Sequence, residues 1–265
     1  IIWDLPSQIR NRYLKYCFSH SIRCYMSPKI SDIILLGTDR IHLFDTPLLM
    51  CRNQGLSMEQ RAAKRVLDII VSGLGIIVSS PIMLIIAIAV KAYDGGPVFY
   101  LQDRLTYQGK EFRIRKFRSM CVDSEKNGAR LASKHDSRIT PVGHVLRNLH
   151  LDELPQLFNV FMGDMSLVGP RPERDVIMQE YEQEIPEFHY RLKVKAGLTG
   201  YAQVYGKYNT TPYDKLKLDL FYIENYSFLL DIKLLFMTVK IFFQKEVSEG
   251  VDDDQKNALK DSQDK

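Results

Sequence analysis

Cysteine is scarce in this sequence of 265 residues. The four cysteines, Cys17, Cys24, Cys51 and Cys121, form no CxxC pair and no Cys/His ligand cluster, so the chain lacks an obvious zinc site. Four cysteines in a chain of this length also make no disulfide framework, which indicates a reducing compartment. After the first residue, Ile1, the basic–apolar–cleavage pattern of a secretory signal peptide is also missing.

A strong excess of charge of one sign is absent as well. Apolar residues make up 45% and charged residues 26% of the sequence, which excludes a disordered chain and a coiled coil. The formal net charge of +4 conceals an asymmetry, because residues 246–265 contain seven acidic residues and three lysines and the remaining sequence carries +8. A basic body predicts an anionic partner, whether phosphates, nucleic acid or lipid headgroups.

Charge is entirely lacking over the twenty-two residues 69–90, which Lys64, Arg65 and Lys91 flank. A helix of this length covers about 33 Å, close to the thickness of a bilayer's hydrocarbon core. A buried core helix is the alternative. Ser80-Pro81 lies near the midpoint, where proline removes a backbone donor and serine hydroxyls can satisfy freed carbonyls. Together with basic residues at both ends, this favours a re-entrant segment over a spanning one.

Residues 1–50 have the pattern of a short α/β piece. A helix is expected over residues 6–18 and short strands over 22–26, 33–36 and 41–44. So few elements bury little surface alone. We therefore expect the end of a larger domain, with a linker near residues 51–57.

The elements that follow the apolar segment alternate between short strands and helices. A hairpin of strands 98–101 and 112–117 carries six basic residues between Arg104 and Arg118, which suits a solvated hairpin, a rim that contacts headgroups, or a phosphate site. Helices are expected at 142–149, from 152, at 174–181 and at 216–243, whereas 163–172 is too rich in Gly and Pro for a regular element. The last helix suits a membrane interface or a buried core.

Adjacent carboxylates at Asp152 and Glu153 are the richest chemical signal. Pro155 fits only the first turn of a helix, so Asp152 is expected as its N-cap. An ionised pair there suits Mg²⁺, which takes one or two carboxylates plus phosphate oxygens, and one carboxylate could attack phosphorus. An ordinary capping pair is the alternative. Arg171 lies between two prolines, which suits either a rigid phosphate clamp or a structural turn.

From about residue 60 to 243 the sequence resembles the bacterial sugar transferase family, the monotopic polyprenyl-phosphate phosphoglycosyl transferases. The motifs follow in order: KRVLDI (64–69), Ser80-Pro81, KFRSM (116–120), LDELPQL (151–157), GDMSLVGPRPE (163–173), AGLTGYAQVYG (196–206) and LDLFYIENYSF (218–228). The resemblance implies transfer of a sugar-1-phosphate from a nucleotide sugar, usually a UDP-sugar, to polyprenyl (undecaprenyl) phosphate. Such a transfer is the first membrane step in assembling exopolysaccharide, capsule or another glycoconjugate.

The resemblance also implies roles for single residues. Asp152 would be the nucleophile that forms an aspartyl-phosphosugar, and Glu153 of the same dyad would help Asp152 hold Mg²⁺. Phosphates would be bound by Lys116, Arg147 and Arg171, Asp219 would support the site, and Ser80-Pro81 would be the helix break. Lys207 stands where the family often has Arg, which keeps the charge but loses the planar fork and could alter donor preference.

The expected fold class is α+β. A partial α/β, Rossmann-like fragment (1–56) would precede a largely helical, membrane-embedded catalytic domain (57–245) with a re-entrant helix-break-helix at about 66–91 and a small β-hairpin. An acidic, disordered tail (246–265) would follow. The natural protein would be longer upstream, as in long-form family members.

The site is expected on the cytosolic face of a bacterial inner membrane, in contact with membrane lipid and without nucleic acid. A homo-oligomer is compatible with the sequence. A membrane-tethered scaffold that binds anionic lipid through its basic hairpin is the alternative, and a nucleotide-sugar hydrolase is a third possibility.

Overall fold

The chain divides into two compact units. The computed structural model describes residues 1–3, 5–51, 55–121, 136, 138–207 and 210–242. The first unit is Ile1–Arg52 and the second is Asn53–Lys265. The expected acidic tail, residues 246–265, lies outside the described residues.

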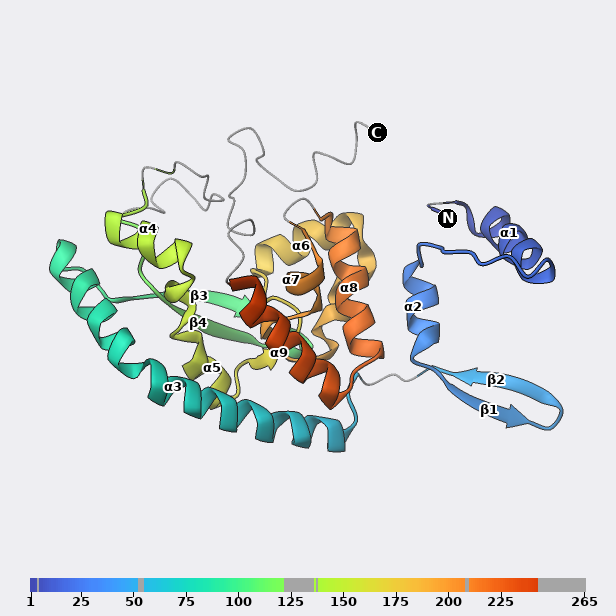
Figure 1. The fold of residues 1–265 in the computed structure, drawn as a ribbon, viewed down its shortest axis with the longest axis horizontal. Helices are drawn as coiled ribbons and strands as arrows, with labels where there is room; N and C mark the ends of the chain where they lie inside the picture. Colours follow the sequence, from blue (N-terminus) through green and yellow to red (C-terminus); the bar gives the residue numbers. More distant parts are fainter. Residues whose placement is uncertain (4, 52–54, 122–135, 137, 208–209, 243–265) are drawn as a thin grey trace. The chain divides into compact units, whose positions relative to one another are not determined.

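Short helices and two-stranded sheets make up most of both units (Figure 1). The helices are α1 (Ser7–Ser19), α2 (Ile30–Leu36), α3 (Met58–Asp94), α4 (Pro141–Asn148), α5 (Gln156–Met162), α6 (Asp175–Glu184), α7 (Tyr201–Tyr205), α8 (Pro212–Glu224) and α9 (Phe228–Phe242). The strands are β1 (Asp39–Leu43), β2 (Thr46–Met50), β3 (Phe99–Leu105), β4 (Glu111–Phe117), β5 (Ser166–Val168) and β6 (Gly197–Thr199). The 3₁₀ turns are η1 (Tyr107–Gly109), η2 (Leu151–Glu153) and η3 (Pro186–Lys193).

The first unit contains α1, α2 and the antiparallel hairpin β1–β2. The predicted strand at 33–36 is wrong, because the segment belongs to α2. Asp32 accepts a hydrogen bond from the backbone N–H of Lys29 at the start of this helix, and Ile33 is fully buried. One parallel bridge joins Ile2 to Met26. A Rossmann-like character of this unit stays a prediction.

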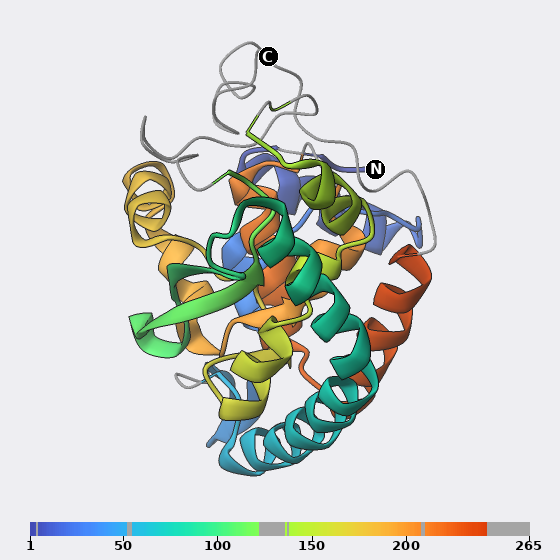
Figure 2. The same ribbon diagram turned by 90° about the vertical axis from the view of Figure 1, so that its left-hand side faces the viewer.

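In the second unit the expected apolar segment is one helix, α3, of 37 residues. It begins with a capping box between Ser57 and Gln60 and ends at Gly95, whose φ is 69°. The helix passes through Ser80-Pro81 without interruption and curves along its length (Figures 1 and 2), so the membrane helix break at these residues stays a prediction. The Ser80 hydroxyl donates to the carbonyl of Ile77, four residues before Pro81, at 2.8 Å. That bond compensates for the missing proline N–H.

Three polar side chains near the start of α3 connect it to three different elements. Lys64 Nζ donates to the Asp231 carboxylate in α9 at 2.6 Å. Arg65 donates to the last carbonyls of α5, those of Val160 and Phe161, at 2.8 and 2.7 Å. Asp68 Oδ1 accepts from the Leu167 N–H in β5 at 2.9 Å. These contacts hold the start of α3 against three other elements of the unit.

The far end of α3 packs against the hairpin. Met83, Ile86 and Val90 form a buried cluster with Phe117 of β4 and Leu146 of α4. The antiparallel hairpin β3–β4 confirms the predicted strands, whereas β5 is a short strand in the segment predicted to be irregular. The predicted last helix is two helices, α8 and α9, which residues 225–227 separate.

We predict that the buried pair of Lys64 and Asp231 holds α3 in place. Lys64→Met leaves Asp231, which is fully buried, without its cation. Removing one partner of a buried pair costs about 3–5 kcal/mol, which corresponds to a fall in Tm of roughly 6–20 °C for a unit of this size. Thermal unfolding in detergent micelles measures this fall.

Lys91→Met is the matched control, because Lys91 lies on the same helix but is exposed and bonds only to the backbone of Gly95 and Gly96 among the described residues. The double variant Lys64→Met/Asp231→Leu removes the unpaired charge and should recover much of the loss. Equal melting of the Lys64 and Lys91 variants would contradict the assignment.

Candidate active site

The two predicted carboxylates lie on η2, between α4 and α5. The turn follows His150, whose φ of 51° reverses the chain after α4. Asp152 is not an N-cap as predicted: it lies inside the 3₁₀ turn, and α5 begins four residues later at Gln156. Leu154 and Pro155 have right-handed helical backbone angles, so the chain coils continuously from η2 into α5.

Glu153 binds two basic side chains that were predicted to bind phosphates. Its Oε1 accepts from Lys116 Nζ in β4 at 2.6 Å and from Arg171 Nη2 at 3.1 Å. Burial alone would raise the pKa of Glu153, but Arg171 and Lys116 outweigh it and hold the pKa well below its usual range. Glu153 is therefore an ionised carboxylate that joins the hairpin to the loop after β5.

Asp152 differs from its neighbour in having no such partner. Its residue is 9% exposed, and within the described part of the chain its carboxylate forms no hydrogen bond or ion pair. Burial raises its pKa, and so does the charge of Glu153, while Lys116 and Arg147 oppose the rise. The result is a carboxylate with weak solvation close to cations, which suits a nucleophile.

Arg147 and Arg171 stand on either side of this acid pair. Arg147 projects from α4, and its Nε donates to the Ser119 hydroxyl just after β4 at 2.9 Å. The Arg171 side chain is 51% exposed, so much of its guanidinium is available to a ligand. The structure thus brings Lys116, Arg147, Asp152, Glu153 and Arg171 together from four segments of the chain.

Asp219 is connected to this group only through another arginine. It lies in α8, fully buried, and its Oδ2 accepts a hydrogen bond from Arg191 Nε at 3.0 Å. The same Arg191 donates to the backbone carbonyl of Arg171 at 2.9 Å. Lys207 is exposed, and no hydrogen bond or ion pair of a described residue connects its side chain to the acid pair.

Sequence reasoning missed Arg191, which lies in η3. Its partners are 20 and 28 residues away along the chain, so no local spacing marks it. Ser119 was also missed, although it lies within the KFRSM motif. Each of these residues holds another polar group in place, and neither is marked by a sequence pattern of its own.

The two carboxylates fit one divalent cation. Among the described residues no cluster of three or more His, Cys, Asp or Glu side chains is arranged for a metal. Mg²⁺ needs only one or two protein carboxylates when a substrate phosphate completes its shell. Asp152 has both oxygens free of described partners, and Glu153 has bonds to one oxygen only. Asp152 with the second oxygen of Glu153 is therefore a suitable donor set.

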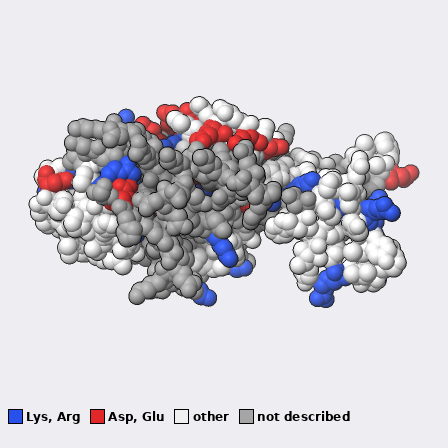
Figure 3. Space-filling model, turned by 90° about the horizontal axis from the view of Figure 1, so that it is seen from above, with Lys and Arg blue, Asp and Glu red and all other residues white. Residues whose placement is uncertain are grey.

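Surface charge does not gather into one basic face in the view of Figure 3, where the exposed Lys and Arg side chains of the described residues are scattered. Acidic side chains gather along one edge instead. Lys116, at 21% side-chain exposure, is among the cations concentrated at the acid pair. The cations at the acid pair favour a small anionic ligand at the carboxylates.

The sequence is similar to known bacterial sugar transferases. A family model described as bacterial sugar transferase matches residues 59–245. The UDP-N-acetylgalactosamine-undecaprenyl-phosphate N-acetylgalactosaminephosphotransferase of Aeromonas hydrophila is 44% identical over 232 residues, 86% of this chain and 54% of that protein. The UDP-glucose:undecaprenyl-phosphate glucose-1-phosphate transferase of Klebsiella pneumoniae is 43% identical over 208 residues, 77% of this chain and 43% of that protein. The chain spans about half the length of these curated relatives.

The buried Asp219 makes stability depend on pH in a defined direction. Burial raises its pKa from 3.8 to about 6, so between these values the folded chain binds a proton that the unfolded chain releases. Its contribution to stability is complete below about pH 4 and falls as pH rises through about 6, by about 3 kcal/mol at most.

The Asp219→Asn variant lacks this titration and serves as the reference. We predict that the Tm of the unsubstituted protein minus that of the variant decreases from about pH 4.5 to about pH 7. Melting curves of both proteins across this range test the prediction. A difference that stays constant or grows with pH would contradict it.

Proposed function

The chain belongs to the bacterial sugar transferase family, and on this premise we propose that it transfers a sugar-1-phosphate from a UDP-sugar to polyprenyl (undecaprenyl) phosphate. The observation that carries the proposal is a buried carboxylate without a described partner, Asp152, beside an ionised Glu153 that two cations hold. Relatives named for this reaction with UDP-N-acetylgalactosamine and UDP-glucose support the substrate class.

We propose a two-step displacement at phosphorus. A carboxylate oxygen of Asp152 attacks the phosphorus bonded to the sugar, the bond to the bridging oxygen of the diphosphate breaks, and UMP leaves with that electron pair. An oxygen of the lipid phosphate then attacks the same phosphorus, and the Asp152 carboxylate leaves. The products are UMP and a polyprenyl diphosphate sugar, and Asp152 returns to its starting state.

The neighbouring cations have separate tasks in these steps. Lys116 and Arg147 favour the ionised form of Asp152 against burial, which keeps it able to attack. The half-exposed Arg171 is suited to bind phosphate oxygens with its fork of N–H groups. Mg²⁺ held by Asp152 and Glu153 would neutralise charge on the transferring phosphate.

We further propose that α3 enters and leaves the membrane on one side. By length and composition, one helix among the described residues, α3, is long and apolar enough to cross a membrane. Its outer face exposes Ile77, Val78 and Ile85 by 71%, 69% and 67%. Such an apolar face is stable in lipid rather than in water.

Contacts at both ends of α3 support the re-entrant arrangement. Lys64 at its start pairs with Asp231, and Asp94 at its end pairs with Arg118, and both partners belong to the same unit. A helix that crossed the bilayer would place these ends on opposite sides. The curve of the helix through Pro81 suits a shallow insertion, with the catalytic site at the cytosolic surface of a bacterial membrane.

A panel of UDP-sugars with polyprenyl phosphate and Mg²⁺, read by UMP release, tests the reaction. We expect release with at least one sugar, and loss of release on chelation of Mg²⁺. A membrane-tethered scaffold predicts no release with any donor. A hydrolase predicts continued turnover without polyprenyl phosphate, whereas a transferase stops after one turnover.

Asp152→Asn should lower the rate of UMP release by at least about 1,000-fold, because an amide oxygen is a poor nucleophile towards phosphorus. Initial rates at saturating donor measure the loss. Asp103→Asn is the matched control, since Asp103 is an exposed acid in the same unit that pairs only with exposed Arg113 among the described residues. Its rate should stay within about twofold of the unsubstituted rate. Turnover by pure Asp152→Asn protein at the normal rate would refute the assigned chemistry.

A further inference from the structure

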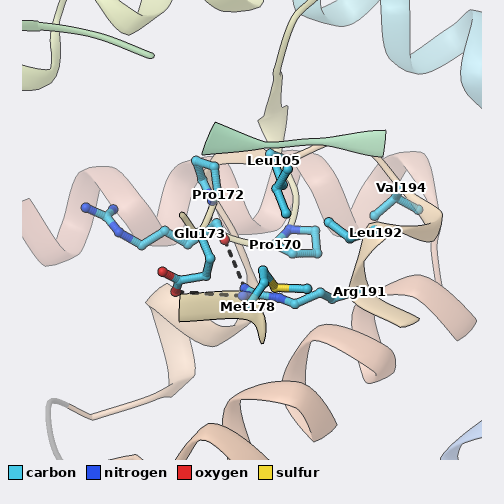
Figure 4. Close-up of a pocket in the computed structure, with 10 residues that line it drawn as sticks. Leu105, Pro170, Pro172, Glu173, Met178, Arg191, Leu192 and Val194 are labelled. Atoms are coloured by element: carbon cyan, nitrogen blue, oxygen red, sulfur yellow. Dashed lines mark hydrogen bonds and ion pairs between the residues drawn. The ribbon is translucent and has the colours of Figure 1, made fainter. Parts of the chain in front are cut away.

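Two consecutive backbone carbonyls in the loop after β5 are held by arginines. Arg191 Nη2 donates to the carbonyl of Arg171 at 2.9 Å, and Arg104 Nη1 donates to the carbonyl of Pro172 at 3.1 Å. The Arg191 side chain is 5% exposed and that of Arg104 is 19% exposed. Figure 4 shows Arg191 beneath the loop, with dashed lines to Glu173 and to a backbone oxygen.

Acidic side chains fix these two arginines in turn. Arg191 Nε donates to Asp219 Oδ2 at 3.0 Å, and Arg191 Nη2 forms an ion pair with the same oxygen at 2.8 Å. Glu173 lies 3.7 Å from the guanidinium of Arg191 and 3.7 Å from that of Arg104. Since Asp219 is on α8 and Glu173 follows the loop, Arg191 is held from two directions and its fork has one orientation.

The loop after β5 connects the Arg191 guanidinium to the acid pair. Arg171 lies between Pro170 and Pro172, whose rings restrict the backbone on both sides. Its carbonyl accepts from Arg191 while its guanidinium donates to Glu153 at 3.1 Å. A change at Arg191 therefore reaches Glu153 through one residue, Arg171.

We propose that Arg191 is a positioning residue that aims Arg171 at the transferring phosphate, and that Asp219 serves the reaction by holding Arg191. The proposal rests on the function proposed above. Arg191 touches neither carboxylate of the acid pair through any hydrogen bond or ion pair of the described residues. It acts through the backbone of Arg171.

Lysine cannot replace this arginine. The Arg191 guanidinium reaches Asp219 through Nε and Nη2, and Nη2 also donates to the Arg171 carbonyl. The lysine side chain is one bond shorter and lacks the planar fork, so Arg191→Lys keeps the charge beside Asp219 and loses the simultaneous bond to the loop. Misplacement of a catalytic group by about 1 Å can cost as much as 100-fold in rate, so we expect a loss of about tenfold.

A double-mutant cycle separates positioning from general damage to the fold. The variants are Arg191→Lys, Arg171→Lys and their combination, and the measurement is the rate of UMP release in a single turnover. If Arg191 acts through Arg171, Arg191→Lys should cost about tenfold alone and less than about twofold in the Arg171→Lys background. Arg10→Lys is the matched control, because Arg10 is equally buried and paired with Asp32 in the first unit, and its rate should stay within about twofold.

The outcomes are distinct. The positioning role is overturned if the losses multiply in the double variant, or if Arg191→Lys releases UMP at the rate of the unsubstituted protein. In either case, UMP release by the unsubstituted protein still upholds the proposed function. Absence of release by the unsubstituted protein overturns both. If Arg191→Lys does not fold, as judged by its melting curve, Arg104→Lys makes the same test at the neighbouring carbonyl of Pro172.

Discussion

The rest of the site depends on the polar contacts that hold the start of α3 against other elements of the second unit. Lys64, Arg65 and Asp68 lie within five residues and bind α9, α5 and β5 respectively. Of these elements, α5 follows the turn that carries the acid pair, and β5 precedes the loop that carries Arg171. A helix with an apolar outer face is thereby attached to the scaffold that holds the chemical groups. The site consequently has a defined distance from whatever surface α3 enters.

At the site, the ion triad of Lys116, Glu153 and Arg171 gives the two adjacent carboxylates different surroundings. Lys116 and Arg171 both bind Glu153, so it is ionised and fixed, while Asp152 is left without a described partner. Adjacent residues thus have different environments: Lys116 and Arg171 bind Glu153, whereas Lys116 and Arg147 act on Asp152 only through their charge. In the mechanism that we propose, Asp152 attacks, Glu153 organises the site, and both carboxylates could hold one divalent cation.

Local chemistry explains which features the sequence predicted well. The charge-free segment, the hairpin and the residues Lys116, Glu153 and Arg171 each carry a signal within a few neighbours, and the structure brings these three side chains together. The prediction of Asp152 as an N-cap is wrong because η2 intervenes before α5, whereas the helix break at Ser80-Pro81 stays a prediction, since α3 is continuous there and Ser80 satisfies the freed carbonyl. Arg191 escaped notice because tertiary folding alone brings it to Arg171 and Asp219.

The most direct test of the account is to identify the covalent intermediate by mass spectrometry. The protein is incubated with Mg²⁺ and an active UDP-sugar but no lipid acceptor, quenched in acid and digested. If Asp152 is the nucleophile, we expect a mass increase of one sugar phosphate on Asp152. This increase should disappear when polyprenyl phosphate is added before the quench. UMP release with an unmodified Asp152, or with the sugar phosphate on another residue, would contradict it.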